Sequence, residues 1–250
     1  MSPEFLASCH TAAAAGNFDL KIVLQYPVRG VEPGPRSYRL NPSKRTLHAK
    51  FAVVDGRLTI AGSSNFTADG LLRDANNLLF ISDRKIARVF EEAFAAIWKG
   101  EVPACSYARR DFALFFSPST DCEAVIRNAV RGAGRSIRFA AFTFTSDAIA
   151  EDLCRVGLRG IAVSGIFERD QASRYGEHSF LSRFPFRVKY DCFVNAIHDK
   201  WFLVDDAIVM TGSYNFTATA RRNIETLMIV SDPAVVERYR RRFRHLWLWY

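Results

Sequence analysis

Two histidine–lysine pairs are the residues of this sequence best suited to chemistry. His48 and Lys50 form the first pair, and His198 and Lys200 form the second pair 150 residues later. In an extended chain, residues two apart point to the same side, so each histidine is expected to share a face with its lysine. Lysine supplies positive charge, and imidazole exchanges protons near neutral pH. Each pair is therefore suited to hold an anion and to attack it or move protons on it.

The two pairs belong to a longer block that occurs twice. In each copy, four residues separate the lysine from an aspartate, Asp55 or Asp205, and the sequence Gly-Ser-x-Asn-Phe-Thr follows. Two matches of this length at a constant offset indicate an internal duplication rather than an accident of composition. A duplicated hairpin with a purely structural role is the alternative explanation.

The residues around each pair predict a hairpin. Apolar, β-branched runs flank Asp55-Gly56, which is a strong signal for two strands joined by a tight turn. We expect Asp55 and Asp205 to brace the turn and the lysine rather than to contact a ligand. Where each return strand ends, Gly62 or Gly212 would let the backbone approach a ligand. The hydroxyl and amide groups that follow are candidates for hydrogen bonds to phosphate oxygens; they belong to Ser63, Asn65, Ser213 and Asn215.

The two blocks resemble the paired His-Lys-Asp motifs of the phospholipase D superfamily. This superfamily includes phospholipases D, cardiolipin synthases, cardiolipin hydrolase-like proteins and metal-independent nucleases. The resemblance covers nearly the whole chain, and it is specific for phosphodiester chemistry rather than for one substrate. It implies two lobes packed about a pseudo-two-fold axis, with the two motifs facing each other across one site.

The resemblance also implies a covalent mechanism. One histidine attacks phosphorus and becomes a phosphohistidine, while the other protonates the leaving oxygen and then activates water. Lys50 and Lys200 would neutralise the non-bridging oxygens as charge builds in the transition state. No cofactor is expected, and no set of cysteines, histidines and carboxylates has the spacing of a metal site. We therefore expect activity without a metal ion.

Glu225 is the expected partner of His48. It follows the second block, and it aligns with Asn76 after the first block. In the superfamily an acidic residue at this place holds the histidine of the opposite motif, which implies a Glu225–His48 hydrogen bond. A carboxylate partner fixes the tautomer and raises the basicity of the other ring nitrogen. This would make His48 the nucleophile and His198 the general acid and base, with His198 held by neutral Asn76 unless Asp74 replaces it. The alternative is that Glu225 is an ordinary surface or salt-bridge residue.

The duplication extends to the elements that must position these residues. Two helix–strand units match each other, as do two later strands and two closing helices; they occupy residues 2–24 and 146–167, 77–82 and 226–231, and 86–98 and 233–247. The second half also contains a strand, a helix and a strand without counterparts in the first half. These are expected at residues 112–116, 121–132 and 137–145.

These patterns predict an α/β fold with two similar lobes. Each lobe is expected to hold a mixed β-sheet flanked by helices. The first lobe should occupy residues 1–100 and the second residues 111–250, with residues 101–110 as a linker. Because the first lobe has no equivalent of residues 109–145, we expect it to be shortened, and truncation of a longer protein is the interpretation we favour.

Composition adds an expectation about partners. The 250 residues carry a net charge of +8, which favours nucleic acid or an anionic lipid surface as a partner. A solvated basic surface is the alternative, and the arginine-rich closing helix at residues 233–247 allows both interpretations. No apolar run is long enough to span a bilayer, and no secretory signal is visible. With five scattered cysteines interpreted as reduced thiols, a cytoplasmic protein is expected.

The expected activity is hydrolysis of phosphodiester bonds in phospholipid or nucleic acid through a phosphohistidine. Two alternatives remain: an anion- or nucleic-acid-binding protein that has lost turnover, and a phosphatidyltransferase similar to cardiolipin synthase. A nuclease predicts a basic groove, whereas a phospholipase predicts an apolar rim or an interfacial helix. Residues 247–250 are a candidate for such a rim. The sequence leaves open whether the protein is a monomer or a dimer.

Overall fold

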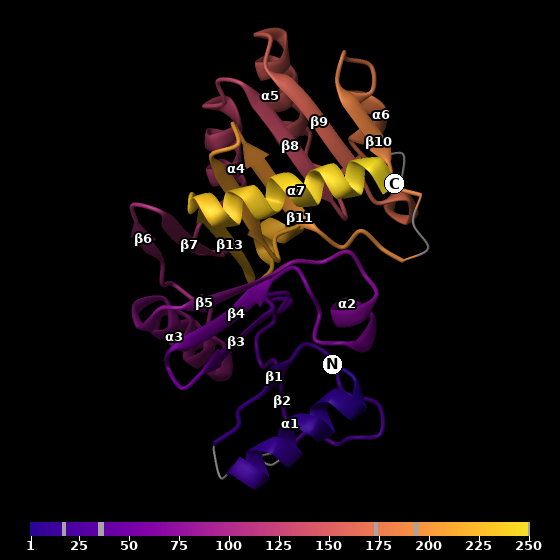
Figure 1. Ribbon diagram of the computed structural model, residues 1–250. Coiled ribbons are helices and arrows are strands. Elements are labelled where there is room, and N and C mark those ends of the chain that lie inside the picture. The colour runs from indigo at the N-terminus through magenta and orange to yellow at the C-terminus, as the bar shows by residue number, and fades with distance from the viewer. Residues whose placement is uncertain (17–18, 35–37, 173–174, 193–194, 250) are drawn as a thin grey trace.

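The computed structural model describes residues 1–16, 19–34, 38–172, 175–192 and 195–249 (Figure 1). Tyr250, the last residue of the predicted apolar rim, lies outside this part of the chain. Two lobes are stacked along the long axis of the molecule, with the first lobe below the second in Figure 1. The α/β fold with two lobes is confirmed.

The first lobe contains three helices and five strands in the part that the structure describes. In chain order they are α1 (Pro3–Gly16), β1 (Val23–Leu24), β2 (Arg39–Leu40), β3 (Phe51–Val54), β4 (Leu58–Gly62), α2 (Ala68–Leu72), β5 (Leu78–Ser82) and α3 (Arg84–Lys99).

The second lobe holds most of the sheet. Its elements are β6 (Tyr107–Arg109), β7 (Phe112–Ser117), α4 (Cys122–Arg131), β8 (Ser136–Ala141), α5 (Asp147–Leu158), β9 (Ala162–Phe167), α6 (His178–Leu181), β10 (Arg187–Tyr190), β11 (Lys200–Val204), β12 (Ile208–Gly212), β13 (Glu225–Val230) and α7 (Pro233–Trp249), with 3₁₀ turns at Arg169–Gln171 and Ala220–Arg222.

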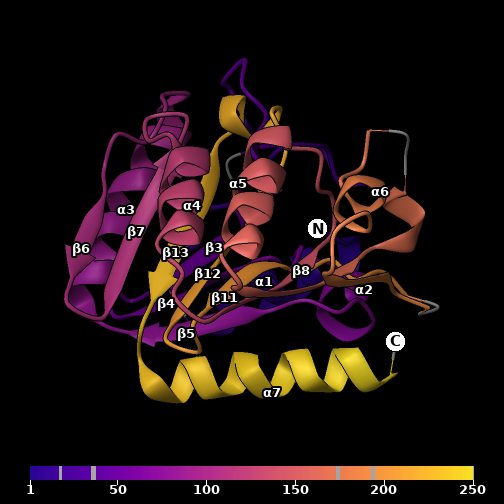
Figure 2. The same cartoon turned by 90° about the horizontal axis from the view of Figure 1, so that it is seen from above.

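The sheet of the second lobe is mixed, as predicted. Its eight strands lie in the order β10-β9-β8-β11-β12-β13-β7-β6. Strands β8, β9 and β10 run parallel, and the remaining pairs are antiparallel. Helices α4 and α5 cover one face and α7 crosses the other (Figure 2). The side chains of β11 alternate between the two faces of the sheet. Phe202 packs in the cluster with α4 and α5, while Trp201 and Leu203 pack under α7.

The sheet of the first lobe differs from the prediction. Strands β3, β4 and β5 form a purely antiparallel sheet, and the parallel pair β1–β2 stands apart from it. In the second lobe β8 lies between β9 and β11 and joins the parallel strands to the motif hairpin. Among the described residues the first lobe has no strand equivalent to β8. The mixed sheet predicted for this lobe is therefore divided into two pieces.

The predicted linker is partly structured. Residues 107–109 of the expected linker at 101–110 form β6, which pairs with β7 at the edge of the large sheet. The strand predicted at 137–145 ends earlier, because β8 stops at Ala141. The other predicted helices and strands are present, with small shifts at their ends.

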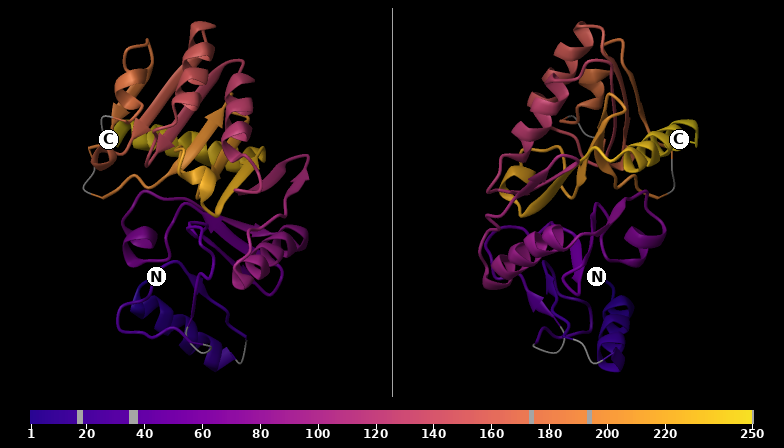
Figure 3. Two further views of the ribbon diagram at one scale, coloured as in Figure 1. Left: turned by 180° about the vertical axis from the view of Figure 1, so that it is seen from behind. Right: turned by 60° about the vertical axis from the view of Figure 1, so that its left-hand side comes forward.

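The lobes share a core. Phe51 of β3, Phe90 of α3 and Phe116 of β7 contact one another, with ring centroids 5.0 to 6.5 Å apart. Two short parallel bridges, Leu47 with Ile224 and Ala75 with Ile197, join the lobes in a pseudo-symmetric way. Figure 3 shows the resulting contact from behind and from one side. In the described part of the chain, none of the helices combines the length and hydropathy needed to cross a membrane.

Candidate active site

Each motif is carried by a hairpin with the predicted tight turn. Asp55 and Gly56 have φ angles of 53° and 58°, and Asp205 and Asp206 have φ angles of 57° and 53°. Glycine adopts this left-handed conformation freely and aspartate tolerates it better than most residues, which explains the composition of both turns. The hairpins β3–β4 and β11–β12 thereby bring the start of each motif back beside its Gly-Ser end.

The two turn aspartates have different surroundings. The carboxylate of Asp205 accepts hydrogen bonds from the backbone N–H groups of Gly134, Arg135 and Ser136 at 2.7 to 2.9 Å. Burial opposes ionisation of Asp205, but these bonds outweigh it and hold the pKa of the carboxyl below its usual value. The side chain of Asp55 has no hydrogen-bond partner among the described residues. The Asp205 carboxylate thus ties its hairpin turn to the segment at the start of β8 and does not contact the lysine.

The motif histidines lie just ahead of the strands rather than within them. The backbone N–H of His48 donates to the carbonyl oxygen of Ile224 at 2.9 Å, across the junction between the lobes. Each lysine ammonium turns back to the carbonyl oxygen of its own motif histidine, Lys50 to His48 and Lys200 to His198, the latter at 2.6 Å. Histidine and lysine of each motif are therefore side by side.

Glu225 holds His48 from the opposite lobe. Its Oε2 atom lies 2.8 Å from Nδ1 of His48, which is the hydrogen bond that the resemblance implied. Glu225 is completely buried, and its carboxylate also accepts hydrogen bonds from the hydroxyl of Ser213 at 2.6 Å and the amide of Asn223 at 3.3 Å. The carboxylate can only accept, so His48 carries its proton on Nδ1 and turns Nε2 away from Glu225.

Asn76 holds His198 in the same way. Its Oδ1 atom lies 2.9 Å from Nδ1 of His198 and also accepts the hydroxyl of Ser63 at 2.9 Å. The amide nitrogen of Asn76 donates to the carbonyl oxygen of Gly70 at 2.9 Å, which fixes the orientation of the side chain. Asn76, not Asp74, is therefore the partner of His198, and Nε2 of His198 is the nitrogen without a proton when the ring is neutral.

The predicted phosphate-binding residues fall into two groups. Ser63 and Ser213 are buried, and their hydroxyls are directed to Asn76 and Glu225 while accepting backbone N–H groups from the next strand. Oδ1 of Asn215 is buried without a hydrogen-bond partner in the described part of the chain, and the Asn65 side chain also makes no hydrogen bond there. This geometry favours a positioning role for the serines and leaves the two asparagines as candidates for ligand contact.

The motif glycines serve packing rather than approach to a ligand. A Cβ atom at Gly62 would lie 2.2 Å from the carbonyl oxygen of Asn77, and one at Gly212 would lie 2.2 Å from that of Thr226. Both contacts are with the neighbouring strand of the same sheet. The expectation of a ligand approach is corrected here, because the absent side chain makes room for β5 and β13.

Burial and crowded positive charge shape the ionisation of the site. Burial, together with the charges of Lys50 and Lys200, lowers the pKa of His48, although Glu225 acts to raise it. Burial, Lys200, Lys50 and His48 together lower the pKa of His198 to about 2. The ammonium groups respond in the same direction: burial lowers the pKa of Lys50 to about 8, although Glu225 opposes this, and burial with the charge of Lys50 lowers the pKa of Lys200 well below its usual value.

These pKa shifts respond to an anionic ligand. The negative charge of a bound phosphodiester would favour the protonated form of all four groups and so oppose the shifts. The set of two imidazoles, two buried ammonium groups and one buried carboxylate is therefore prepared to receive an anion. Among the described residues, no group of three or more histidines, cysteines or carboxylates is arranged to hold a metal ion.

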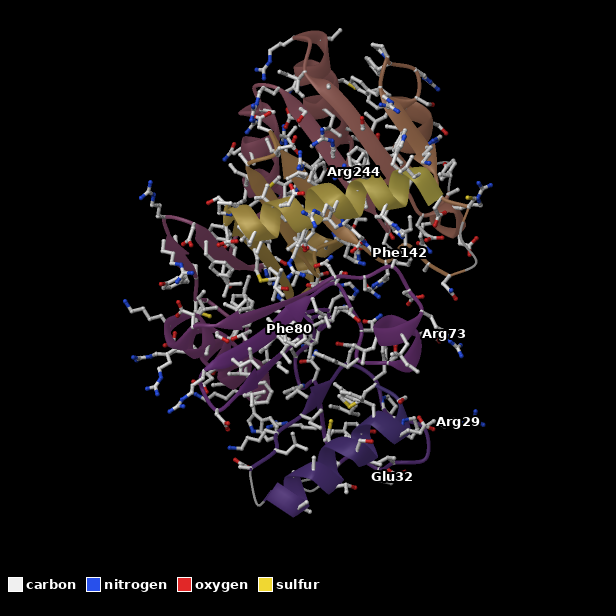
Figure 4. The ribbon with its side chains drawn as sticks, viewed as in Figure 1. Arg29, Glu32, Arg73, Phe80, Phe142 and Arg244 are labelled. Carbon is white, nitrogen blue, oxygen red and sulfur yellow. The ribbon has the colours of Figure 1, made fainter. Side chains whose placement is uncertain are left out.

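Three further residues at the site were not found from the sequence. Phe142 lies where the lobes meet (Figure 4), with its ring centroid 4.5 Å from that of His198 and 4.7 Å from Nζ of Lys200. Buried Asp199 accepts a hydrogen bond from Asn77 at 2.8 Å. Arg242 of α7 lies 3.4 Å from the other oxygen of Asp199. Alternation along the His-Asp-Lys sequence could have placed Asp199 opposite the histidine face, but its partners depend on the packing of the lobes.

Comparisons with known proteins identify the family of this chain. A family described as "Cardiolipin synthase, PLD-like domain" matches residues 26–98 and 126–247, which is more than half of the chain. The chain is similar to the mitochondrial cardiolipin hydrolase of Xenopus laevis, with 32% identity over 118 residues that cover 46% of this chain and 56% of that protein.

It is also similar to the phospholipase D of Rickettsia felis, with 30% identity over 126 residues that cover 50% of this chain and 63% of that protein. The matched segments thus span less than two thirds of either relative. The crystal structure of phosphatidylserine synthase from Haemophilus influenzae aligns with 97% of this chain and 78% of its own length, at a TM-score of 0.73 and 13% identity, which shows a shared fold. The chain belongs to the phospholipase D-like superfamily.

Proposed function

We propose that this protein is a phosphodiesterase that hydrolyses phospholipids through a phosphohistidine intermediate. The observation that carries the proposal is that each motif histidine is held by a residue of the opposite lobe. Glu225 holds Nδ1 of His48, and Asn76 holds Nδ1 of His198. Each histidine therefore keeps its Nε2 nitrogen for chemistry, next to two buried lysines that attract a phosphate group.

The carboxylate of Glu225 supports His48 as the nucleophile. Attack by Nε2 of His48 on phosphorus forms the N–P bond while the bond from phosphorus to the leaving oxygen breaks. The imidazole becomes positively charged in this step, and Glu225 stabilises that charge at 2.8 Å. Lys50 and Lys200 stabilise the charge that develops on the non-bridging oxygens, with Asn65 and Asn215 as further donors.

His198 completes the reaction as general acid and base. It gives a proton from Nε2 to the leaving oxygen, so that the alcohol departs neutral. It then takes a proton from water as the water oxygen attacks phosphorus and the N–P bond breaks. The products are an alcohol and a phosphomonoester, and both histidines return to their starting states. Protonated His198 at the start depends on the bound phosphodiester, because its negative charge opposes the lysine charges that lower the pKa of this histidine.

Two considerations favour phospholipid as the substrate and a metal-independent reaction. The sequence relatives are a cardiolipin hydrolase and a phospholipase D, and the family description names a cardiolipin synthase. Two buried lysines supply the charge that a metal ion supplies in other phosphodiesterases. Transfer to an alcohol other than water would use the same steps and differs only in the acceptor.

A parallel turnover assay tests the proposal. Cardiolipin vesicles, plasmid DNA and single-stranded RNA are incubated with the protein in excess chelator, with the His48→Ala protein as a control for contaminating enzymes. We expect release of the lipid product without added metal and no release by the control. Cleavage of nucleic acid alone would transfer the proposal to a nuclease, and phosphate-analogue binding without turnover of any substrate would overturn the assignment as an enzyme.

A further inference from the structure

A cavity that is lined by none of the histidine–lysine residues lies beneath the C-terminal half of α7. It has a volume of about 320 Å³ and is lined from β8, β9, β10 and α7. We call it the α7 cavity and define it by the side chains that give it its character: Arg138, Arg187, Phe243, Arg244, Trp247 and Leu248. Helix α7 crosses the sheet and ends beside β10, and Arg244 is labelled on it in Figure 4 (Figures 1 and 4).

Two of the three arginines in the α7 cavity lack an acidic partner among the described residues. Arg138 forms an ion pair with Asp206. Arg187 and Arg244 are exposed, and their guanidinium groups form no ion pair or hydrogen bond with the residues that the structure describes. A guanidinium is a strong donor to a phosphate group, and a ring contact such as that of Arg187 with Trp247 leaves its N–H groups available. The charge of the α7 cavity is therefore complementary to an anion.

The rim of the same cavity is apolar. Leu248 is 75% exposed. It follows Trp247 near the end of the arginine-rich helix α7. An exposed leucine beside an indole and exposed arginines is the composition of a surface that rests on a bilayer, with apolar groups at the acyl boundary and arginines at the headgroups. Charge complementarity and the apolar rim together point to an anionic lipid surface.

The indole of Trp247 argues against a single nucleic acid strand as the ligand. Its ring stacks on Phe243 with centroids 5.6 Å apart, and the Arg187 guanidinium and Lys189 ammonium lie over it at 4.9 and 4.6 Å. A nucleobase stacks on a free aromatic face, and here it would have to displace a group of the protein. A lipid headgroup needs only the outward donors of the arginines.

The first lobe shows which features are particular to the second. Arg39 lies over Trp98 at 5.5 Å, so a cation above the tryptophan of the closing helix occurs in both lobes and serves packing. Helix α3 then ends at Lys99 and is capped by Gly100. Of the two described closing helices, only α7 has the exposed leucine and the cavity with exposed, unpaired arginines.

We propose that the α7 cavity is a docking site for an anionic bilayer surface, with Arg187 and Arg244 binding lipid phosphates and Leu248 entering the acyl boundary. This surface would hold the protein at the membrane independently of turnover. It deepens the proposed lipid activity but does not depend on it, since none of its residues contacts the histidine–lysine centre. Docking is expected to weaken as salt concentration rises, because exposed charges are screened.

Vesicle co-sedimentation tests the proposal. The protein is mixed with vesicles of phosphatidylcholine alone or with about one third phosphatidylglycerol, and the bound fraction is measured. We expect binding to the anionic vesicles only. Loss of both arginines in Arg187→Gln/Arg244→Gln should lower the partition coefficient roughly 20- to 30-fold, and Leu248→Ser should lower it about fivefold.

Matched variants in the first lobe serve as controls. Arg57→Gln/Arg84→Gln removes two exposed arginines, and Leu72→Ser removes a leucine that is 83% exposed. Both controls should bind as the unchanged protein does, and so should the His198→Ala protein, which separates docking from catalysis. Equal losses in the controls would show that only net charge matters and would overturn the site. Unchanged vesicle binding with reduced retention of single-stranded DNA in the arginine variant would assign the surface to nucleic acid instead.

Discussion

The two lobes present the same histidine–lysine hairpin but place different groups behind it. His48 meets the carboxylate of Glu225 at 2.8 Å, and His198 meets the amide oxygen of Asn76 at 2.9 Å. In both cases a buried serine hydroxyl of the opposing lobe donates to the same acceptor oxygen. The arrangement of these hydrogen bonds is thus the same in both lobes, but the acceptor is charged for His48 and neutral for His198. The residue that follows each motif, Asn76 or Glu225, therefore distinguishes the two histidines, and the motif itself does not.

Surroundings reinforce this asymmetry. The second motif hairpin lies inside an eight-stranded sheet, with β8 on one side of β11 and β12 on the other, whereas β3 pairs only with β4 among the described strands. Lys200 is correspondingly 1% exposed and Lys50 6% exposed. Phe142, which follows β8, packs against His198 and Lys200. Burial is the leading cause of the lowered pKa of both histidines, and it acts on His198 without a carboxylate to oppose it.

Removal of either histidine should lower activity more than any other substitution at the site. We expect His48→Ala and His198→Ala each to lower turnover of a lipid substrate by at least about a thousandfold, since nucleophile and proton donor are both essential. An aryl phosphodiester separates them, because its leaving group departs without a proton. His198→Ala should then accumulate phosphate on His48, as mapped by mass spectrometry of the quenched protein, while His48→Ala should show none. Phosphate on His198 in the His48→Ala protein would reverse the roles.

Substitution of the residues that hold the two histidines, Glu225 and Asn76, should have a smaller effect. Glu225→Gln keeps an acceptor for His48 but removes the charge, so turnover should fall about ten- to a hundredfold and the pKa of His48 should fall further. Asn76→Asp should raise the pKa of His198, because a carboxylate favours the charged ring. NMR titration of the ring protons measures both shifts, and thermal melting checks folding, since the new carboxylate faces the Gly70 carbonyl. If neither substitution changes the pKa of its histidine, Glu225 and Asn76 do not act on the histidines through these hydrogen bonds.

Much of this site follows from the sequence because a duplicated motif fixes local structure strongly. The hairpins, their left-handed turns and the matching strands and helices are encoded within short stretches, so alternation and turn residues predict them well. The partner of His48 was predicted from the resemblance and the alignment of Glu225 with Asn76. Both histidines, however, precede the strands that were expected to contain them. In the first motif the backbone N–H groups of His48 and Ala49 both donate to Ile224 of the other lobe, which replaces the start of the strand pairing.

The remaining features depend on contacts between distant segments. The hydroxyls of Ser63 and Ser213 donate to Asn76 and Glu225 rather than to a ligand. No pattern within the motif predicts these contacts. Phe142 reaches His198 only because β8 pairs with β11, and Arg242 reaches Asp199 only because α7 crosses the sheet. The separation of β1–β2 from β3 likewise follows from a strand order that local propensity does not determine.

The turn aspartates offer the smallest and most local test of the comparison. Asp205→Asn keeps a side chain that tolerates the left-handed φ of 57°, but its amide must turn a donor toward at least one of the backbone N–H groups that Asp205 now accepts. We expect a loss of about 1–2 kcal/mol in the free energy of unfolding at neutral pH. Asp55→Asn, at a φ of 53° and without such partners among the described residues, should change it by less than about 0.5 kcal/mol. Because the pKa of Asp205 is lowered in the folded state, the stabilisation by its carboxylate is complete above the pKa of the unfolded state. It is lost as the pH falls through the pKa of the folded state.

Urea unfolding at neutral pH and below pH ~4 measures this stabilisation. The difference in unfolding free energy between the Asp205→Asn protein and the unchanged protein should narrow on acidification. Equal effects of Asp205→Asn and Asp55→Asn at neutral pH would contradict the difference between the lobes.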